Sequence, residues 1–169
     1  MRKLKKLTAL LLALTLLFVC AACGSGNSTT DGGKTISGTL PEIIDRLYDT
    51  VDVDDEQRDF LKNSVGTVEI PKDQSAYYFG VENLDFEEAV ASEPFINAIA
   101  FSVCLMRVKD GTDIDELKAE IRRSANPAKW ICVDVNPNDV RVESVGALVL
   151  LIMADDSEKY SEAFYALAE

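Results

Sequence analysis

The chain has 169 residues, with 17 basic and 29 acidic side chains and no histidine, which gives a formal charge of -12 at neutral pH. This balance disfavours nucleic acid and anionic lipid headgroups as partners. It leaves cations and basic protein patches as electrostatic partners, but we prefer the interpretation that the acidic balance mainly keeps an exported domain in solution. The lack of histidine excludes a serine hydrolase with an imidazole base and a metal site of cysteine and histidine ligands.

The first 22 residues predict an export signal. Four basic residues precede an apolar run over residues 7–19: Arg2, Lys3, Lys5 and Lys6. At ~1.5 Å per residue this run is too short to cross a hydrocarbon core of about 30 Å. A basic start, a short apolar run and small residues at its end are typical of a signal peptide rather than of a spanning helix.

Cys23 is the predicted site of lipid attachment. The sequence Ala21-Ala22-Cys23-Gly24 resembles the bacterial lipobox, in which the cysteine receives a diacylglyceryl thioether and becomes the mature N-terminus. Two acyl chains hold a protein firmly at a bilayer, so the expected location is the extracytoplasmic face of the cell membrane. Cys20 stands where the lipobox most often has leucine, and ordinary cleavage after Ala22, which would release a soluble secreted protein, stays an alternative.

Removal of residues 1–22 takes away four basic side chains and no acidic one, so the mature chain has 13 basic and 29 acidic residues and a formal charge of -16. Residues 23–38 are rich in Gly, Ser and Thr and predict a flexible tether. Residues 39–169 suit a single domain. A domain of this size folds without a metal or disulfide scaffold.

Cap residues and apolar spacing predict the helices of this domain. Thr39 and Glu42 form a capping box, Asp54 with Gln57 begins a second helix, and Asp113 with Glu116 opens another. The expected helices are residues 39–48, Asp55 to Asn63, Leu84 to Ala91, a helix from Asp113 that ends before Asn126-Pro127, and a final helix capped by Asp155 or Ser157.

Alternating, aromatic and β-branched residues predict the strands. The two longest, Ala98 to Lys109 and Ala147 to Ala154, are apolar on both faces and are expected in the middle of the sheet. In Val140 to Val145, Arg141 and Glu143 are expected to point together toward solvent. The shorter expected strands are Val68 to Ile70, Ala76 to Val81, and Trp130 to Val135.

The order of elements after Ala98 predicts an α+β fold. We expect a two-layer sandwich, with a mostly antiparallel sheet and helices packed on one face.

Four segments carry a family resemblance: AIAFSVCLMRVKDG, DIDELKAEIRR, KWICV, and VGALVLLIMADD before the final helix. In these patterns of hydrophobicity and turns, the chain from about Tyr77 to its end resembles a family of small Gram-positive bacterial lipoproteins that carry a domain of unknown function. The resemblance implies an envelope lipoprotein with one compact domain, and it supplies no activity and no functional residues.

Three groups of residues are candidates for chemistry, each with a structural alternative that we prefer. Five acidic residues within residues 52–59 offer oxygen ligands for Ca²⁺, but an EF-hand loop starting at Asp52 would need glycine where Gln57 stands. Cys104 and Cys132 are expected as buried thiols, with a disulfide or a nucleophile as alternatives. The aromatic residues expected in the core, with sugar or peptide stacking as the alternative, are Tyr77, Tyr78, Phe79 and Trp130.

No catalytic motif or phosphate-binding loop occurs in the sequence. The hypothesis from sequence is therefore a lipid-anchored binding or assembly module, without catalysis or cofactor, whose protein or cell-wall partner the sequence does not name. The alternatives are a small extracytoplasmic enzyme that uses carboxylates or a thiol, and a structural spacer.

Overall fold

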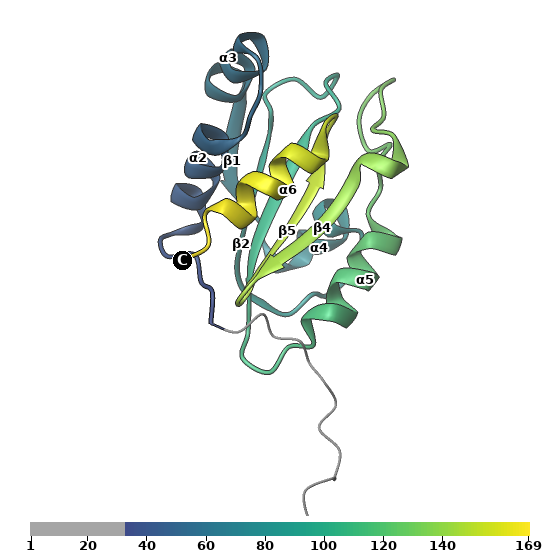
Figure 1. Ribbon diagram of the computed structural model, residues 1–169. Helices are drawn as coiled ribbons and strands as arrows, with labels where there is room; N and C mark the ends of the chain where they lie inside the picture. The colour runs from purple at the N-terminus through teal and green to yellow at the C-terminus, as the bar shows by residue number, and fades with distance from the viewer. Residues whose placement is uncertain (1–32) are drawn as a thin grey trace, which may run out of the picture. The chain divides into compact units, whose positions relative to one another are not determined.

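Five α-helices and five strands are arranged along residues 33–169, the part of the chain that the computed structural model describes (Figure 1). The helices are α2 (Leu40–Thr50), α3 (Asp55–Asn63), α4 (Ser75–Phe79), α5 (Ile114–Ser124) and α6 (Ser157–Ala166). The strands are β1 (Val65–Glu69), β2 (Phe86–Pro94), β3 (Ser102–Val108), β4 (Val140–Val145) and β5 (Leu148–Met153). Two short 3₁₀ helices, η1 (Lys72–Gln74) and η2 (Pro137–Asp139), complete the set.

The strands form one sheet in the order β1-β2-β3-β5-β4, and every neighbouring pair is antiparallel. β3 is the middle strand and β5 lies beside it, with each residue of β5 buried, so both long apolar runs are in the interior of the sheet as predicted. The predicted α+β class with an antiparallel sheet is confirmed.

Helices cover both faces of the sheet, so the fold has three layers rather than the two expected from the sequence (Figure 1). Val103 and Leu105 of β3 pack against α2, α3 and α6, whereas Cys104 and Met106 point to the opposite face, which α4 and α5 cover. The physical reason lies in the strands themselves. Because β3 and β5 are apolar on both sides, each side needs a cover that removes it from water.

Three helices begin at the caps that the sequence predicts. The Thr39 amide donates to Glu42 Oε2 at 2.9 Å, and the reciprocal bond closes the capping box of α2. Asp54 accepts a hydrogen bond from the Gln57 amide at 2.8 Å, and Asp113 caps α5 in the same way. These side chains satisfy amides that the first turn of a helix leaves unpaired.

The first residue of α6 differs from the prediction. Its cap is Asp156, which has a left-handed backbone (φ 55°) and makes no capping hydrogen bond with its side chain. Asp155 precedes the cap, and the Ser157 hydroxyl accepts a hydrogen bond from Arg141 Nε at 3.2 Å instead of capping the helix.

The segment predicted as a helix from Leu84 to Ala91 is the strand β2. Its register shifts between Phe86 and Glu88, which places one extra residue in the strand. Phe86 and Ala89 therefore face the same side of the sheet at a spacing of three residues, a spacing that normally indicates a helix.

Two predicted strands are absent from the structure. Residues 76–81 belong mostly to the short helix α4, which ends at Gly80 in the left-handed conformation (φ 76°). A side chain at Gly80 would meet the Ser124 carbonyl at 2.0 Å, so glycine is required there. Residues 130–135 are irregular, because Cys132 has a positive φ of 61° that interrupts an extended chain.

Arg141 and Glu143 point to the same side of β4 as predicted, but α6 covers that side. Ser161 and Tyr165 of α6 donate hydrogen bonds to the Glu143 carboxylate at 3.1 and 2.6 Å. The expectation that this pair faces open solvent is therefore wrong, because the helices are on both faces of the sheet.

The first described residues run along the end of the sheet that contains the two-residue turn between β4 and β5, which we call the hairpin end. The Lys34 carbonyl lies there, 3.3 Å from the position of a side chain at Gly146. Arg107 donates to the Gly38 carbonyl at 3.1 Å, and Thr35 and Glu169 exchange two backbone hydrogen bonds. Contacts of the domain thus extend to Thr35, four residues before Thr39.

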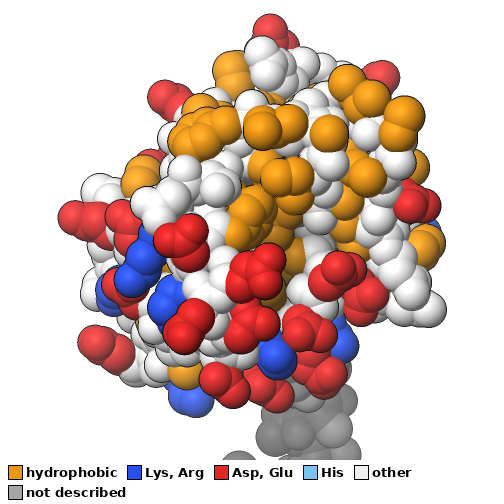
Figure 2. All heavy atoms as spheres, turned by 90° about the horizontal axis from the view of Figure 1, so that it is seen from above, with side chains coloured by type: hydrophobic (Ala, Val, Ile, Leu, Met, Phe, Trp, Pro, Cys, Tyr) orange, Lys and Arg blue, Asp and Glu red, His pale blue; other side chains and the backbone are white. Residues whose placement is uncertain are grey.

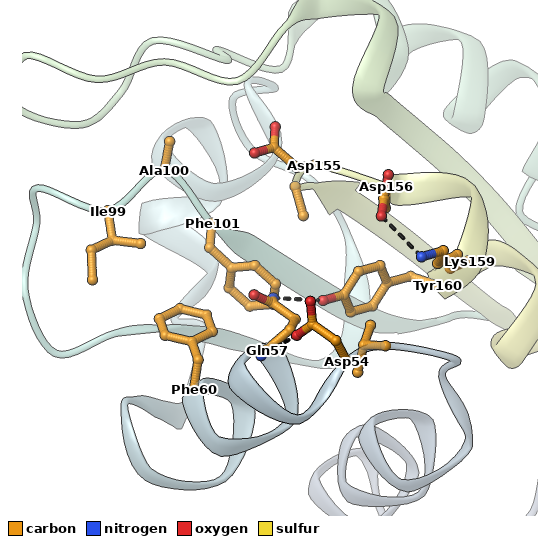
Figure 3. A pocket seen from close by; sticks show the side chains of 12 residues that line it. Asp54, Gln57, Phe60, Ile99, Ala100, Phe101, Asp155, Asp156, Lys159 and Tyr160 are labelled. Carbon is orange, nitrogen blue, oxygen red and sulfur yellow. Dashed lines mark hydrogen bonds and ion pairs between the residues drawn. The ribbon is translucent and has the colours of Figure 1, made fainter.

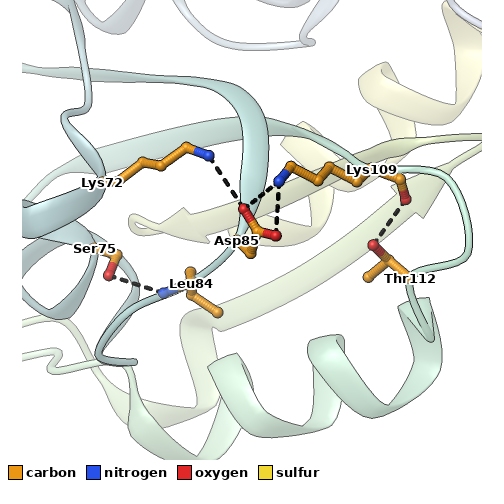
Figure 4. A network of polar contacts seen from close by, with 6 residues as sticks. All are labelled: Lys72, Ser75, Leu84, Asp85, Lys109 and Thr112. Carbon is orange, nitrogen blue, oxygen red and sulfur yellow. Dashed lines mark hydrogen bonds and ion pairs between the residues drawn. The ribbon is translucent and has the colours of Figure 1, made fainter.

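An exposed ion-pair network at the hairpin end joins η1 to the residue just before β2 and the residue just after β3 (Figure 4). The Asp85 carboxylate lies 3.1 Å from Lys72 Nζ and 2.6 Å from Lys109 Nζ. The hydrogen bond from Lys109, followed by that from Lys72, lowers the pKa of Asp85 below its ordinary value.

Candidate functional site

The opposite end of the sheet, which we call the loop end, exposes four apolar side chains. Phe95, Ile96 and Ile99 belong to the connection between β2 and β3, and Ile131 belongs to the connection between α5 and β4. Phe95 is 73% exposed, Ile96 64% and Ile131 63%. Figure 2 looks down on this end and shows hydrophobic side chains gathered over it, with acidic side chains along the margin. We call these four residues the apolar tip.

The two connections that make up the apolar tip contact each other and the sheet. The Ile131 amide donates to the Asn97 carbonyl at 3.0 Å, and the Phe95 amide donates to the Ser64 carbonyl at 3.1 Å. The Phe95 ring lies over Gly66 of β1, where a side chain would meet ring atom Cε1 at 2.6 Å. The apolar side chains are therefore presented by connections with fixed backbone contacts.

A partly buried ion pair fixes both connections at their bases. Lys129 Nζ lies 2.5 Å from Glu93 Oε1, and its side chain is 3% exposed. Glu93 comes two residues before Phe95, and Lys129 comes two residues before Ile131. Ser102 completes the cluster, donating to Glu93 at 2.7 Å and lying 3.2 Å from Lys129 Nζ.

Three aromatic rings surround the Lys129 ammonium. Its Nζ lies 4.9 Å from the ring centre of Tyr77, 5.3 Å from that of Trp130 and 5.4 Å from that of Tyr78. Cation–π attraction and the Glu93 carboxylate together offset the cost of removing this ammonium from water. The expected packing role is confirmed for Trp130 and Phe79, which are buried, while Tyr77 is half exposed beside the lysine.

The two cysteines of the domain are free thiols in different surroundings. Cys104 is fully buried beneath Ser102, and burial raises the pKa of its thiol to about 11. A thiol of that pKa stays protonated at neutral pH, which argues against a nucleophilic role. Cys132 was expected in a buried strand but is exposed on the connection that carries Ile131, and the disulfide alternative does not hold in this structure.

A pocket of about 310 Å³ adjoins the apolar tip (Figure 3). Ile99 and Ala100 form its rim on the side of the tip, so the two features are continuous. Its wall is aromatic, with the Phe101 ring centre 5.4 Å from that of Phe60 and 5.9 Å from that of Tyr160. The lining comes from α3 and the residues just before it, the residues that precede β3, those that follow β5, and the start of α6.

Three carboxylates line the same pocket: Asp54, Asp155 and Asp156. Asp54 caps α3, and Asp156 lies 3.0 Å from Lys159 Nζ. Within residues 33–169, Asp155 has no hydrogen-bond or ion-pair partner for its side chain.

Tyr160 connects the aromatic wall of the pocket to its polar rim. Its hydroxyl accepts a hydrogen bond from Gln57 Nε2 at 3.0 Å. Burial raises the pKa of this phenol, while the hydrogen bond from Gln57 acts in the opposite direction. The tyrosine therefore stays neutral across the physiological pH range.

Acidic residues within residues 52–59 make hydrogen bonds at the start of α3 and along it. Asp54 is its cap, and Asp59 accepts a hydrogen bond from Asn63 Nδ2 at 2.8 Å. Across residues 33–169, no group of three or more cysteine, aspartate or glutamate side chains is placed to hold a metal ion.

Sequence reasoning missed the apolar tip and the pocket. The tip had a local signal, since Phe95 and Ile96 follow Pro94 directly in a segment with no predicted element. The pairing of Glu93 with Lys129 had no local sequence signal, because 36 residues separate the two positions.

The predicted lipid-attachment residue Cys23, the signal peptide of residues 1–22 and most of the tether lie outside the described residues. None of the helices described between residues 33 and 169 has the length and apolar character needed to cross a bilayer.

Comparison with known proteins gives no relative: no family model, no curated protein and no solved structure matches this chain. The resemblance to small Gram-positive lipoproteins therefore stays a prediction.

Proposed function

We propose that this protein is a lipid-anchored binding module of the extracytoplasmic membrane face, and that it binds a protein partner through the apolar tip. The observation that carries the proposal is the exposure of Phe95, Ile96 and Ile131 on connections fixed by a partly buried ion pair. Exposed apolar side chains that form one patch are typical of interaction sites. Because this pair holds the two connections in place, less conformational entropy is lost when a partner covers the patch.

The position of the tip favours a protein over the lipid surface as its partner. The chain enters the domain at the hairpin end, next to Gly146, whereas the tip lies at the loop end. The formal charge of -16 on the mature chain also repels anionic headgroups.

Charge favours a partner with basic residues around an apolar centre. Exposed carboxylates flank the tip on neighbouring connections, among them Asp54, Asp134 and Asp155. Opposite charges at the rim of an interface raise the association rate and exclude wrong partners. Two copies of this acidic chain would repel each other, so we do not propose a second copy as the partner.

The anchor is tested by the intact mass of the protein from membrane fractions of cells that make wild type or Cys23→Ala. We expect acyl mass on the wild type and loss of the variant from the membrane. Wild-type protein free in the medium without acyl mass would refute the anchor.

The binding surface is tested by affinity purification from detergent-solubilised envelope. We expect one basic protein to be recovered with wild type and with Val68→Ser, an exposed apolar residue of β1 outside the tip. The same protein should be lost with the Phe95→Ser/Ile96→Ser double variant. Equal recovery with all three proteins, or a dimer of the wild type on size exclusion, would contradict the proposal.

A further inference from the structure

We infer that the pocket beside the apolar tip takes one lysine or arginine side chain of the partner. The inference rests on the proposed function, because it assigns a specificity pocket to the same interface. The volume of about 310 Å³ is near the lower limit of ligand pockets, so it suits a single long side chain rather than a folded element.

The wall of the pocket suits the apolar stem and the cationic end of such a side chain. The partly exposed Phe60 ring and the exposed Ile99 side chain give a surface against which methylene groups pack. Behind them lie the rings of Phe101 and Tyr160, which are 2% and 1% exposed. Aromatic faces also attract a guanidinium or an ammonium group. The cavity and its aromatic wall define the site, and the carboxylates at the rim select the charge of the ligand.

The balance of charge at the rim is negative. Asp54, Asp155 and Asp156 face one ammonium, that of Lys159, which Asp156 already binds at 3.0 Å. The first turns of α3 and α6 add about half a positive charge each. Asp54 occupies the amides at the start of α3. The rim therefore favours a cation over an anion.

Asp155 is the residue expected to pair with the incoming cation. Figure 3 shows its carboxylate at the rim, next to the start of α6. Because no other described side chain holds Asp155, an ion pair with a ligand replaces contact with water and disrupts no bond within the domain.

The experiment is a titration of the full processed chain, as purified from expressing cells, followed by the NMR signals of the Ala100 and Asp155 amides. The probes are the N-acetyl methylamides of arginine, lysine, norleucine and glutamate. They share one backbone and differ in stem and charge. We expect the two cationic probes to shift both amides, with a dissociation constant at least threefold lower than that of norleucine, and glutamate to shift neither.

The matched variants are Asp155→Asn in the pocket and Asp110→Asn, an exposed carboxylate in the turn after β3 at the hairpin end. Asp155→Asn should weaken arginine binding about threefold, and Asp110→Asn should leave it unchanged. Phe60→Leu, which shortens the aromatic wall, should also weaken it. Binding of glutamate or norleucine as tightly as arginine, or an unchanged arginine affinity in Asp155→Asn, would overturn the inference.

This outcome is independent of the proposed function, because the probes require no partner. If the probes do not bind but the tip still captures a partner, only the assignment of the pocket is refuted. If the probes bind but no partner is captured by the tip, only the proposed function is refuted.

Discussion

The two ends of the sheet are built in opposite ways. At the hairpin end the connection between β4 and β5 is a two-residue turn, and the ion pairs of Asp85 are exposed to solvent. At the loop end the connections are longer, apolar side chains face solvent, and the charged pair of Glu93 and Lys129 is mostly removed from solvent, with side chains 20% and 3% exposed. This difference is what the proposed binding role of the loop end predicts, because binding residues are often carried on connections that a rigid scaffold positions.

Loss of Lys129 should have the largest effect at the loop end. Lys129→Met leaves Glu93 as a partly buried charge without its partner and is expected to lower the free energy of unfolding by about 3–5 kcal/mol. Urea denaturation measures this value. The Glu93→Gln/Lys129→Met double variant should recover part of the loss, because no uncompensated charge remains. A loss below about 1 kcal/mol for Lys129→Met would show that the pair does not hold the connections.

Alkaline pH should destabilise the domain through Cys104. The pKa of the folded thiol is about 11, against 9.0 for a free thiol, so the native state binds more protons between these values. The stabilisation from the protonated Cys104 thiol is complete below pH 9 and is lost as the pH rises through 11. The free energy of unfolding falls by about 2–3 kcal/mol over this range.

The free energy of unfolding between pH 8.5 and 11 should therefore fall less steeply in Cys104→Ala than in wild type. Buried tyrosines, whose phenols also have raised pKa values, act in the same direction in both proteins. Equal slopes for the two proteins would contradict the assignment to Cys104.

Serine at the apolar tip should separate binding from stability. Ile96→Ser changes an exposed residue and is expected to alter the free energy of unfolding by less than about 0.5 kcal/mol. The same change should reduce partner affinity at least tenfold, which titration calorimetry or surface plasmon resonance measures once the partner is purified. Destabilisation with unchanged affinity would assign the tip a structural role.

The smallest effect is expected at the hairpin end. Lys109→Met removes one exposed partner of Asp85, while Lys72 remains. We expect the urea midpoint to move far less than in Lys129→Met, because exposed ion pairs contribute little to stability. Because the pKa of Asp85 is lowered in the folded state, its ion pairs stabilise the fold at pH values above the carboxyl's ordinary pKa. This stabilisation is lost as the pH falls from the ordinary pKa through the lowered one. A midpoint shift as large as that of Lys129→Met would remove the contrast between the ends.

The sequence predicts the elements that depend on local signals. The capping box of α2, the aspartate caps of α3 and α5, and the apolar runs of β3 and β5 are each set by residues within a few positions of each other. The α+β class follows from the order of these elements. Apolar residues on both faces of β3 also contained the signal for a third layer, which the prediction did not use.

The predictions that failed depend on information outside the local window. The extra residue near Glu88 gave β2 the spacing of a helix, and the left-handed backbone at Cys132 ended an apparent strand. The candidate site was even harder to predict from the sequence, because the pocket and the pair of Glu93 with Lys129 form only when distant segments come together in the fold. Its parts have ordinary roles in sequence, as caps, aromatic core residues and loop residues.

The most direct test is photo-crosslinking in living cells with a photoreactive residue at one of four exposed positions. Ile96 and Ile131 lie in the apolar tip, Gly111 is in the turn at the hairpin end, and Val68 is on the edge strand β1. The account predicts an adduct of one defined mass, with the same basic protein, from positions 96 and 131 and none from positions 68 and 111. Adducts of equal yield from both ends, or none from the tip while position 111 reacts, would contradict it.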